Sequence, residues 1–302
     1  GQITFGERQP LLGMMDCHGL TDPGLVRENN EDQFLIADLR KSVTIHHTSL
    51  SYDDETELHG GSQGKLLLVA DGIGGTAAGE RASSLALEGV VQYLLNAMHW
   101  LFRFDTDRDE EFLADLKSAL SWSQEKIQHA AEANPQQSGM GTTLTMAYLV
   151  WPRAYFVHVG DTRAYLYRDS ELIQLTHDQT IAQMLADAGV IAAEEVDEHP
   201  FHHVLGSLLG CDVKQLEPAV YKTELKHQDQ LLLCTDGLTR HVGDERIAGI
   251  LASAGTAELA CQELIAAANE DGGSDNVTAV LARFSPAEGR SVATAEAEAA
   301  VG

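Results

Sequence analysis

Cysteine is scarce in this chain of 302 residues, and the four that occur lie far apart, at positions 17, 211, 234 and 261. No two of them form the Cys-x-x-Cys pair of a thiolate zinc site, and their spacing does not suggest a disulfide framework. The sequence also has no internal repeat and no hydrophobic run approaching the 18 residues or so that a membrane helix needs. These absences argue against a small disulfide-rich protein, a solenoid and a helical membrane protein.

Basic residues are few: 20 Lys and Arg stand against 46 Asp and Glu, which gives a net charge of -26 and a pI near 4.7. Such a surface repels nucleic acid phosphates and anionic lipid, so we expect no nucleic acid partner and no membrane partner. It would instead attract cations and basic polypeptide segments. The first residues lack the basic stretch and apolar core of a secretion signal. We therefore expect a cytoplasmic protein, and we expect it to be a monomer.

The order of predicted elements favours an α+β fold. Helical stripes are predicted after residue 76, over 109–133, over 181–188 and over 259–268, while residues 40–64 read as a long hairpin or a flexible acidic loop. Strands come mostly in consecutive short runs, which suits antiparallel sheets with helices stacked outside better than a regular alternation of strand and helix. The predicted strands cover 14–19, 34–37, 66–70, 143–150, 153–159, 163–168, 231–235 and 277–284.

Carboxylates recur at the ends of the predicted strands. The runs LLLVAD, YFVHVGD and LLLCTD end in Asp71, Asp161 and Asp236, whereas Asp275 opens the last strand. Glu31 and Asp32 likewise stand just before a strand. Strand ends are where a rigid scaffold presents side chains to a shared cleft.

Electrostatics decides what such a cleft would need. If Asp71, Asp161, Asp236 and Asp275 share it, each like-charge pair at about 5 Å costs about 3 kcal/mol at an effective dielectric constant of about 20. Six pairs would cost on the order of 20 kcal/mol, which exceeds the roughly 5–15 kcal/mol that stabilises a domain. The carboxylates must therefore be protonated or neutralised, and Mg²⁺ or Mn²⁺ with oxygen ligands is the natural partner.

The segment 66–75 is open to two other interpretations. An Asp-Gly at the end of a strand can be a simple turn. Gly72-x-Gly74-x-x-Ala77 also fits the loose fingerprint of a dinucleotide site, which requires an acidic residue at the end of a second strand roughly 20 residues on. The nearest candidate, Glu88, lies within the helix pattern, so we reject the dinucleotide interpretation.

Six segments follow one another along the chain: TDPGLVRENNED, LLLVADGIGGTAAGERAS, GMGTTLT, VHVGDTRAYLYR, LLLCTDGLT and GGSDNVTAV. In order and spacing they resemble the motif series of the metal-dependent type 2C serine/threonine protein phosphatases (the PPM family) in their bacterial form. The resemblance runs from about residue 14 to residue 284. It implies a four-layer αββα sandwich, two antiparallel sheets flanked by helix pairs, with a dinuclear Mn²⁺ or Mg²⁺ centre at one end.

The resemblance also assigns roles to residues at matching positions. Asp71 should bridge both metal ions, the carbonyl of Gly72 should bind one of them, and Asp236 and Asp275 should bind the other. Asp161, with Asp236, is similar to the pair that holds a third and weaker metal. Glu31 and Asp32 should orient metal-bound waters, and Arg27 matches the arginine that grips the substrate phosphate. A covalent phosphocysteine route is not expected.

The sequence departs from the family pattern at several points. Ile73 stands where animal relatives have a histidine that can protonate the leaving group, so the general acid is unassigned and a metal-bound water is our first choice. Gln179 follows Asp178 where the family usually has Asp-His, and HHVLGSLLG lacks the usual Thr-Arg. The histidines at 46–47, 199 and 202–203 lack the spacing of an ordered metal site, and we expect them to be solvent-exposed.

The function predicted is that of a signalling enzyme, a hydrolase that removes phosphate from phosphoserine and phosphothreonine in proteins by a metal-activated water. Its partners would be phosphorylated proteins. The alternatives are a catalytically silent phosphoprotein-binding regulator on the same fold and a nucleotide-binding module. The predicted organisation is one catalytic domain over residues 1–285, with a flap at about 178–210 and the acidic excursion at about 40–64. A disordered tail is expected over 286–302.

Overall fold

The structure is a computed structural model, and it describes residues 2–5, 15–53, 55–75, 77–97, 108–210 and 216–284. The side chains of 2–5 and 61–63 are not described. Cys211 and the predicted tail, 286–302, lie outside the described residues. Within them, Cys17, Cys234 and Cys261 are free thiols, and no helix is both long and apolar enough to cross a membrane.

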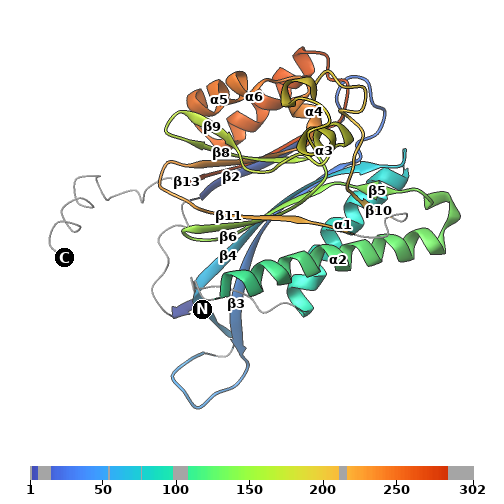
Figure 1. Cartoon of the computed structure of the whole chain (residues 1–302). Helices are drawn as coiled ribbons and strands as arrows, with labels where there is room; N and C mark the ends of the chain where they lie inside the picture. The colour runs from blue at the N-terminus through green and yellow to red at the C-terminus, as the bar shows by residue number, and fades with distance from the viewer. Residues whose placement is uncertain are drawn as a thin grey trace.

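The described strands form two sheets packed face to face (Figure 1). The larger has eight strands, six of them in the order β10-β5-β4-β6-β7-β11, with β1 and β3 also paired to β4; the smaller has the order β2-β13-β12-β8-β9. The strands of the larger sheet are β1 (Gln2–Phe5), β3 (Asp32–Ile45), β4 (Thr56–Ile73), β5 (Gly141–Thr142), β6 (Leu144–Val150), β7 (Arg153–Val159), β10 (Leu209–Gly210) and β11 (Ala219–Glu224). Those of the smaller are β2 (Met15–Asp22), β8 (Arg163–Arg168), β9 (Glu171–Gln174), β12 (Gln230–Cys234) and β13 (Val277–Phe284).

Helices cover the outer face of each sheet, which gives the αββα order of layers that the resemblance implies (Figure 1). Two long helices pack against the larger sheet, α1 (Ala77–Asn96) and α2 (Asp109–Ala133). The smaller sheet is covered by α4 (Asp236–Thr239), α5 (Asp244–Ser253) and α6 (Ala257–Glu270). Three short elements complete the description: α3 (Ile181–Asp187) and the 3-10 turns at Pro135–Gln137 and Ala193–Glu195.

The continuous apolar run of β4 is explained by burial on both faces. Successive side chains of a strand point to opposite faces. Leu66 and Leu68 therefore enter the core beneath α1 and α2, whereas Leu67 and Val69 enter the core between the two sheets. A third core lies between the smaller sheet and its helices. Each sheet is thus fixed on both sides, and strand ends meet rigidly at one end of the sandwich.

Several sequence predictions are confirmed and others are corrected. The predicted helix 109–133 and strand 277–284 agree with α2 and β13, and the excursion at 40–64 is a hairpin, because β3 continues to Ile45 and β4 begins at Thr56. The run LLLVAD is part of a longer strand that ends at Ile73. Asp236 does not close a strand but opens α4. The sheets are antiparallel except for one pair, since β1 runs parallel to β4.

Candidate metal centre

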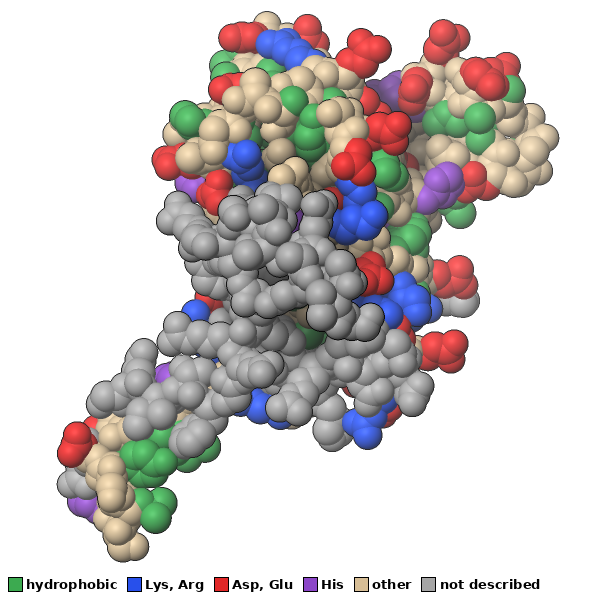
Figure 2. Space-filling model, turned by 90° about the vertical axis from the view of Figure 1, so that its left-hand side faces the viewer, with side chains coloured by type: hydrophobic (Ala, Val, Ile, Leu, Met, Phe, Trp, Pro, Cys, Tyr) green, Lys and Arg blue, Asp and Glu red, His purple; other side chains and the backbone are tan. Residues whose placement is uncertain are grey.

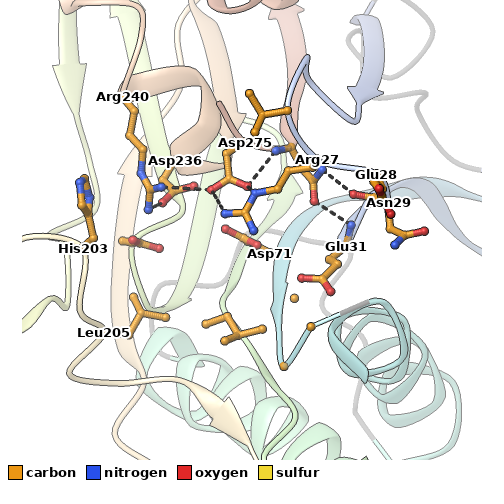
Figure 3. A pocket seen from close by; sticks show the side chains of 17 residues that line it. Arg27, Glu28, Asn29, Glu31, Asp71, His203, Leu205, Asp236, Arg240 and Asp275 are labelled. Atoms are coloured by element: carbon orange, nitrogen blue, oxygen red, sulfur yellow. Dashed lines mark hydrogen bonds and ion pairs between the residues drawn. The ribbon is translucent and has the colours of Figure 1, made fainter. Parts of the chain in front are cut away.

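One cavity of about 560 Å³ lies at the end of the sandwich where the predicted acidic residues meet (Figure 3). Its wall includes Asp71 at the end of β4, Asp161 after β7, Asp236 at the start of α4 and Asp275 before β13. Glu31, Arg27 and Gly72 also line it. Residues separated by more than 200 positions in the sequence therefore share one cavity. Asp32 is the only predicted site residue that is not part of this wall.

The backbone around Asp71 is fixed by the neighbouring β5–β6 segment. The Asp71 N–H donates to Thr143 Oγ1 at 3.0 Å, and the Asp71 carbonyl accepts from the Thr143 N–H and the Thr142 Oγ1, each at 2.9 Å. Both threonines are fully buried. The two threonines therefore hold the backbone of Asp71 in place.

Gly72 is required by close packing. A Cβ at this position would lie 2.1 Å from the carbonyl oxygen of Gly79 on α1 and 2.9 Å from that of Glu31. The Gly72 N–H donates to the Glu31 carbonyl at 3.1 Å. The strand end, the start of α1 and the loop before β3 therefore meet at distances that only glycine permits.

Asp32 lies just behind the cavity and is 2% exposed. Its Oδ2 accepts hydrogen bonds from Thr235 Oγ1 at 2.8 Å and from Thr278 Oγ1 at 2.7 Å, whereas Oδ1 is buried with no partner. Burial raises the pKa of Asp32 to about 7, although the two hydroxyl groups act in the opposite direction. Its neighbour Glu31 is held by a hydrogen bond of 2.9 Å from its N–H to the Asn276 side chain.

Two arginines hold two of the carboxylates. Arg27 contacts Asp275 through Nε at 3.0 Å and Nη2 at 3.1 Å. Arg240, the residue directly after α4, donates from Nη1 to Asp275 at 3.1 Å and pairs through Nη2 with Asp236 (Figure 3). Arg27 therefore lies at the cavity, where the sequence placed it, but its guanidinium contacts a predicted metal ligand.

Asp161 lies at the junction with the flap. It is 8% exposed, and burial together with the nearby Asp236 raises its pKa to about 8. The Gly160 N–H donates to the Gln179 side chain at 2.9 Å, and the Gln179 N–H donates to the Gly160 carbonyl at 2.8 Å. Gln179, which departs from the family pattern, thus ties the flap to the turn that carries Asp161. The flap also supplies His203 and Leu205 to the cavity wall.

The electrostatics of this cavity favour a bound cation. Burial raises the pKa of Asp71 well above its usual value, and repulsion by Asp32, Asp236, Asp161 and Asp275 raises it further. Burial also raises the pKa of Asp236, although Arg240 and a hydrogen bond from Asp71 act in the opposite direction. In the described part of the chain, three buried carboxylate oxygens have no hydrogen-bond partner, and all three lie at or just behind this cavity: Glu31 Oε1, Asp32 Oδ1 and Asp236 Oδ1. Unpaired carboxylate oxygens at one place suit Mg²⁺ or Mn²⁺.

As the side chains stand, no three acidic, histidine or cysteine residues in the described ranges are arranged around one point as metal ligands. Oxygens of Asp236 and Asp275 face the guanidinium group of Arg240. The donor set fits a divalent metal, whereas the assignment of individual ligands stays a prediction.

One segment has the sequence spacing of a phosphocysteine route, although the structure does not favour that chemistry. The segment from Cys234 to Arg240 has the Cys-x5-Arg spacing of phosphatases with a cysteine nucleophile. Cys234, however, ends β12 with 0% exposure, and burial raises the pKa of its thiol to about 12. A buried neutral thiol is not a nucleophile. Arg240 faces the carboxylates instead.

Sequence reasoning missed two residues that the structure brings into the site, Arg240 and Asn276. Arg240 follows Asp236 by four positions, a spacing that places both on one face of a helical turn. Asn276 joins three segments, since it accepts from Glu31 N–H and donates to the carbonyls of Pro23 and Asn29. The spacing of Arg240 becomes a signal only once α4 is known, and α4 was not predicted. The contacts of Asn276 join segments far apart in the sequence, so they have no local signal.

Comparison with known proteins places these observations in a family. The family model described as "Protein phosphatase 2C" matches residues 45–282. The serine/threonine protein phosphatase PstP of Mycobacterium tuberculosis is 36% identical over 263 residues, which is 87% of this chain and 43% of the relative. The chain thus spans less than half the length of that relative. The serine/threonine phosphatase stp of Listeria monocytogenes is 31% identical over 261 residues, which is 86% of this chain and 92% of the relative.

A solved structure supports the same grouping. The catalytic domain of the serine/threonine protein phosphatase PstP, in complex with two manganese ions, superposes with a TM-score of 0.67 at 34% identity, covering 90% of this chain and 98% of that one.

Proposed function

This chain belongs to the protein phosphatase 2C family, and we propose that it hydrolyses phosphoserine and phosphothreonine monoesters in proteins with the aid of bound Mn²⁺ or Mg²⁺. The observation that carries the proposal is the single cavity in which Asp71, Asp161, Asp236 and Asp275 converge beside Glu31 and Arg27. Both the curated relatives and the manganese-bound neighbour are named as serine/threonine phosphatases, which supports it.

The resemblance to the family assigns the residues that would hold the ions, and their common place in the wall of this cavity supports the assignment. We assign Asp71 to both ions of a dinuclear centre, the Gly72 carbonyl to one of them, and Asp236 and Asp275 to the other. Asp161, with Asp236, would hold a third and weaker ion. Bound divalent ions supply positive charge that offsets the charge of a phosphate ester and acidify water.

The chain's own residues would do the rest. Glu31 and Asp32 present unpaired carboxylate oxygens, Glu31 Oε1 and Asp32 Oδ1, which can accept protons or hydrogen bonds from water. Arg27 is 53% exposed and carries a planar fork of donors that matches two oxygens of a phosphate group. The buried threonines 142 and 143 and the glycine contacts at 72 and 79 keep the acidic side chains in place.

The wider setting is also proposed. The substrates would be phosphorylated proteins, and an acidic surface favours basic segments around the phosphorylated residue. Acidic side chains are scattered over the upper part of the face in Figure 2, not gathered in one patch. We further propose a cytoplasmic monomer. Its catalytic domain would cover residues 1–285, and its flap at 178–210 would shape substrate choice.

Residues 286–302 should be dispensable for catalysis. A shortened chain that ends at residue 285 should therefore show the same turnover as the full chain.

Hydrolysis of a phosphothreonine peptide and of p-nitrophenyl phosphate tests the proposal. Turnover should require Mn²⁺ or Mg²⁺, and it should disappear in Asp236→Asn while the variant still folds. Binding of the phosphopeptide without turnover under any metal would contradict the enzymatic function and leave a phosphoprotein-binding regulator. A melting temperature that rises with nucleotide and not with Mn²⁺ would instead favour the nucleotide-binding module.

A further inference from the structure

Arg240 occupies a distinctive place in the site. It lies at the end of α4, one helical turn beyond Asp236, and its guanidinium bridges Asp236 and Asp275 (Figure 3). Arg27, by comparison, contacts Asp275 alone. The Arg240 side chain is 28% exposed, whereas that of Arg27 is 53% exposed. The more buried of the two arginines is therefore the one that joins both carboxylates.

Arg240 lies between two cavities. It lines the cavity of about 560 Å³ and a second cavity of about 730 Å³, which lies between the flap and the segment 236–244. Asp161, His203 and Asp236 belong to both walls as well. The charge of Arg240 lies close enough to act on the ionisation of Asp161 and His203. One guanidinium thus supplies positive charge at the junction of the two cavities.

We propose that Arg240 is an internal counter-cation that competes with divalent metal ions for Asp236 and Asp275 and thereby sets the metal affinity of the site. This inference rests on the proposed function, because it takes these two carboxylates to be metal ligands. An N–H of Arg240 donates to Asp275 Oδ2, and the guanidinium pairs with Asp236 Oδ2. A metal ion that takes those oxygens must displace the guanidinium, since both cations seek the same lone pairs and repel each other.

Removing the arginine should strengthen metal binding for two reasons. The competitor is gone, and the two carboxylates are left with less neutralising charge, so the metal-free site is raised in free energy. Metal binding then relieves more repulsion than in the native chain. A purely structural role predicts the reverse, since misplaced carboxylates would bind metal more weakly. The direction of the change therefore separates competition from scaffolding.

The experiment uses the full chain, freed of metal with a chelator, and measures Mn²⁺ binding by calorimetry and thermal unfolding with and without Mn²⁺. The variants are Arg240→Gln, which removes the charge, and Arg240→Lys, which keeps it. Arg246→Gln is the matched control, because Arg246 pairs with Glu270 at 2.8 Å on the outer helices, away from the site. None of these readouts depends on turnover.

Arg240→Gln should bind Mn²⁺ about tenfold more tightly, the scale expected for ion pairs of a partly exposed arginine. Its metal-free form should melt at a lower temperature than the native chain, and Mn²⁺ should raise its melting temperature by more. Arg240→Lys should lie between the two, and Arg246→Gln should bind Mn²⁺ as the native chain does. Equal or weaker Mn²⁺ affinity in Arg240→Gln would overturn the inference alone. Absence of Mn²⁺ binding to the native chain would overturn the proposed function together with it.

Discussion

Asp32 lies directly opposite Asp71 as the terminal pair of the antiparallel ladder between β3 and β4. Two carboxylates in register at one strand end are unfavourable, since like charges opposite each other destabilise a sheet. The structure reduces this cost on one side only. Asp32 accepts hydrogen bonds from two buried threonine hydroxyls. The side chain of Asp71 lies at the cavity instead, where burial and its acidic neighbours raise its pKa well above the usual value.

This relationship predicts opposite effects of one substitution on activity and on stability. In Asp71→Asn the amide removes a charge that burial and four acidic neighbours oppose. The metal-free variant should therefore melt at the same temperature as the native chain or higher. Turnover should fall by at least about a hundredfold, the scale of losing a principal electrostatic contact. Differential scanning calorimetry and a phosphopeptide assay check the pair of outcomes. A melting temperature lowered by many degrees would show that Asp71 is structural.

Arg27→Ala should weaken substrate binding while leaving metal binding intact. Arg27 is exposed enough to reach a ligand, and hydrogen bonds to charged groups contribute about 1.5–3 kcal/mol. We expect kcat/KM for a phosphothreonine peptide to fall about 10- to 100-fold, mainly through KM. Calorimetry should show Mn²⁺ still bound. Loss of Mn²⁺ binding would mean that Arg27 serves the metal ligands and not the phosphate.

The parts of the fold that could be predicted are those with a long or uniform pattern. The apolar stripe that begins at Phe112 and continues through Leu116 and Leu120 to Ile127 is buried on one face of α2. Because this stripe is long, the predicted bounds agree with those of the helix. The helix α5 was missed, because only Ile247 and Leu251 are buried in it and two residues make no stripe. Sheet membership could not be predicted either. The consecutive strands β7 and β8 belong to different sheets. Both nevertheless have buried central residues and the same β-branched and aromatic character in sequence.

The residues of the site also fall into those that the sequence could predict and those that it could not. Its acidic residues could be found because each stands at the end of a recognisable strand or beside a glycine. The bridging role of Arg240 and the joining role of Asn276 depend on how side chains from segments about 35 to 250 positions apart come together. Local pattern carries no information on such contacts, so only the folded chain reveals them.

Gly72→Ala should destabilise the protein by several kcal/mol and abolish turnover. The new Cβ would overlap the Gly79 carbonyl oxygen at 2.1 Å, and both atoms belong to backbone that is held by a strand and a helix. Overpacking that forces backbone shifts costs about 1–3 kcal/mol or more.

Gly249→Ala is the matched control for Gly72→Ala. It lies on the exposed side of α5 with nothing within 4 Å of its Cβ position, so alanine should stabilise by up to about 1 kcal/mol. Urea denaturation of both variants measures the contrast, and equal effects would contradict this account of the packing.

His158 predicts how stability changes with pH. It is fully buried on β7, where Nδ1 lies 2.8 Å from Thr145 Oγ1 and Nε2 lies 3.1 Å from the His177 carbonyl. Burial lowers its pKa from 6.5 to about 4, although Asp178 acts in the opposite direction. The folded protein therefore keeps this histidine neutral while the unfolded chain takes up a proton below about pH 6.5, so its contribution is complete above that pH and is lost as the pH falls toward 4.

Between pH 8 and pH 5 the loss from His158 should amount to about 2 kcal/mol. His158→Gln cannot take up this proton in the unfolded state, so its free energy of unfolding should fall less over the same range. The deficit of the variant relative to the native chain should therefore shrink as the pH is lowered. His129→Gln, at an exposed position on α2, is the control, and its free energy of unfolding should change with pH as that of the native chain does.

Urea denaturation of the metal-free proteins at each pH measures these free energies of unfolding. The site carboxylates contribute equally to all three proteins, so their effect cancels in the comparison. A deficit that is constant with pH would mean that His158 is protonated in the folded protein, and that the buried polar contacts around Thr145 do not exclude the charge.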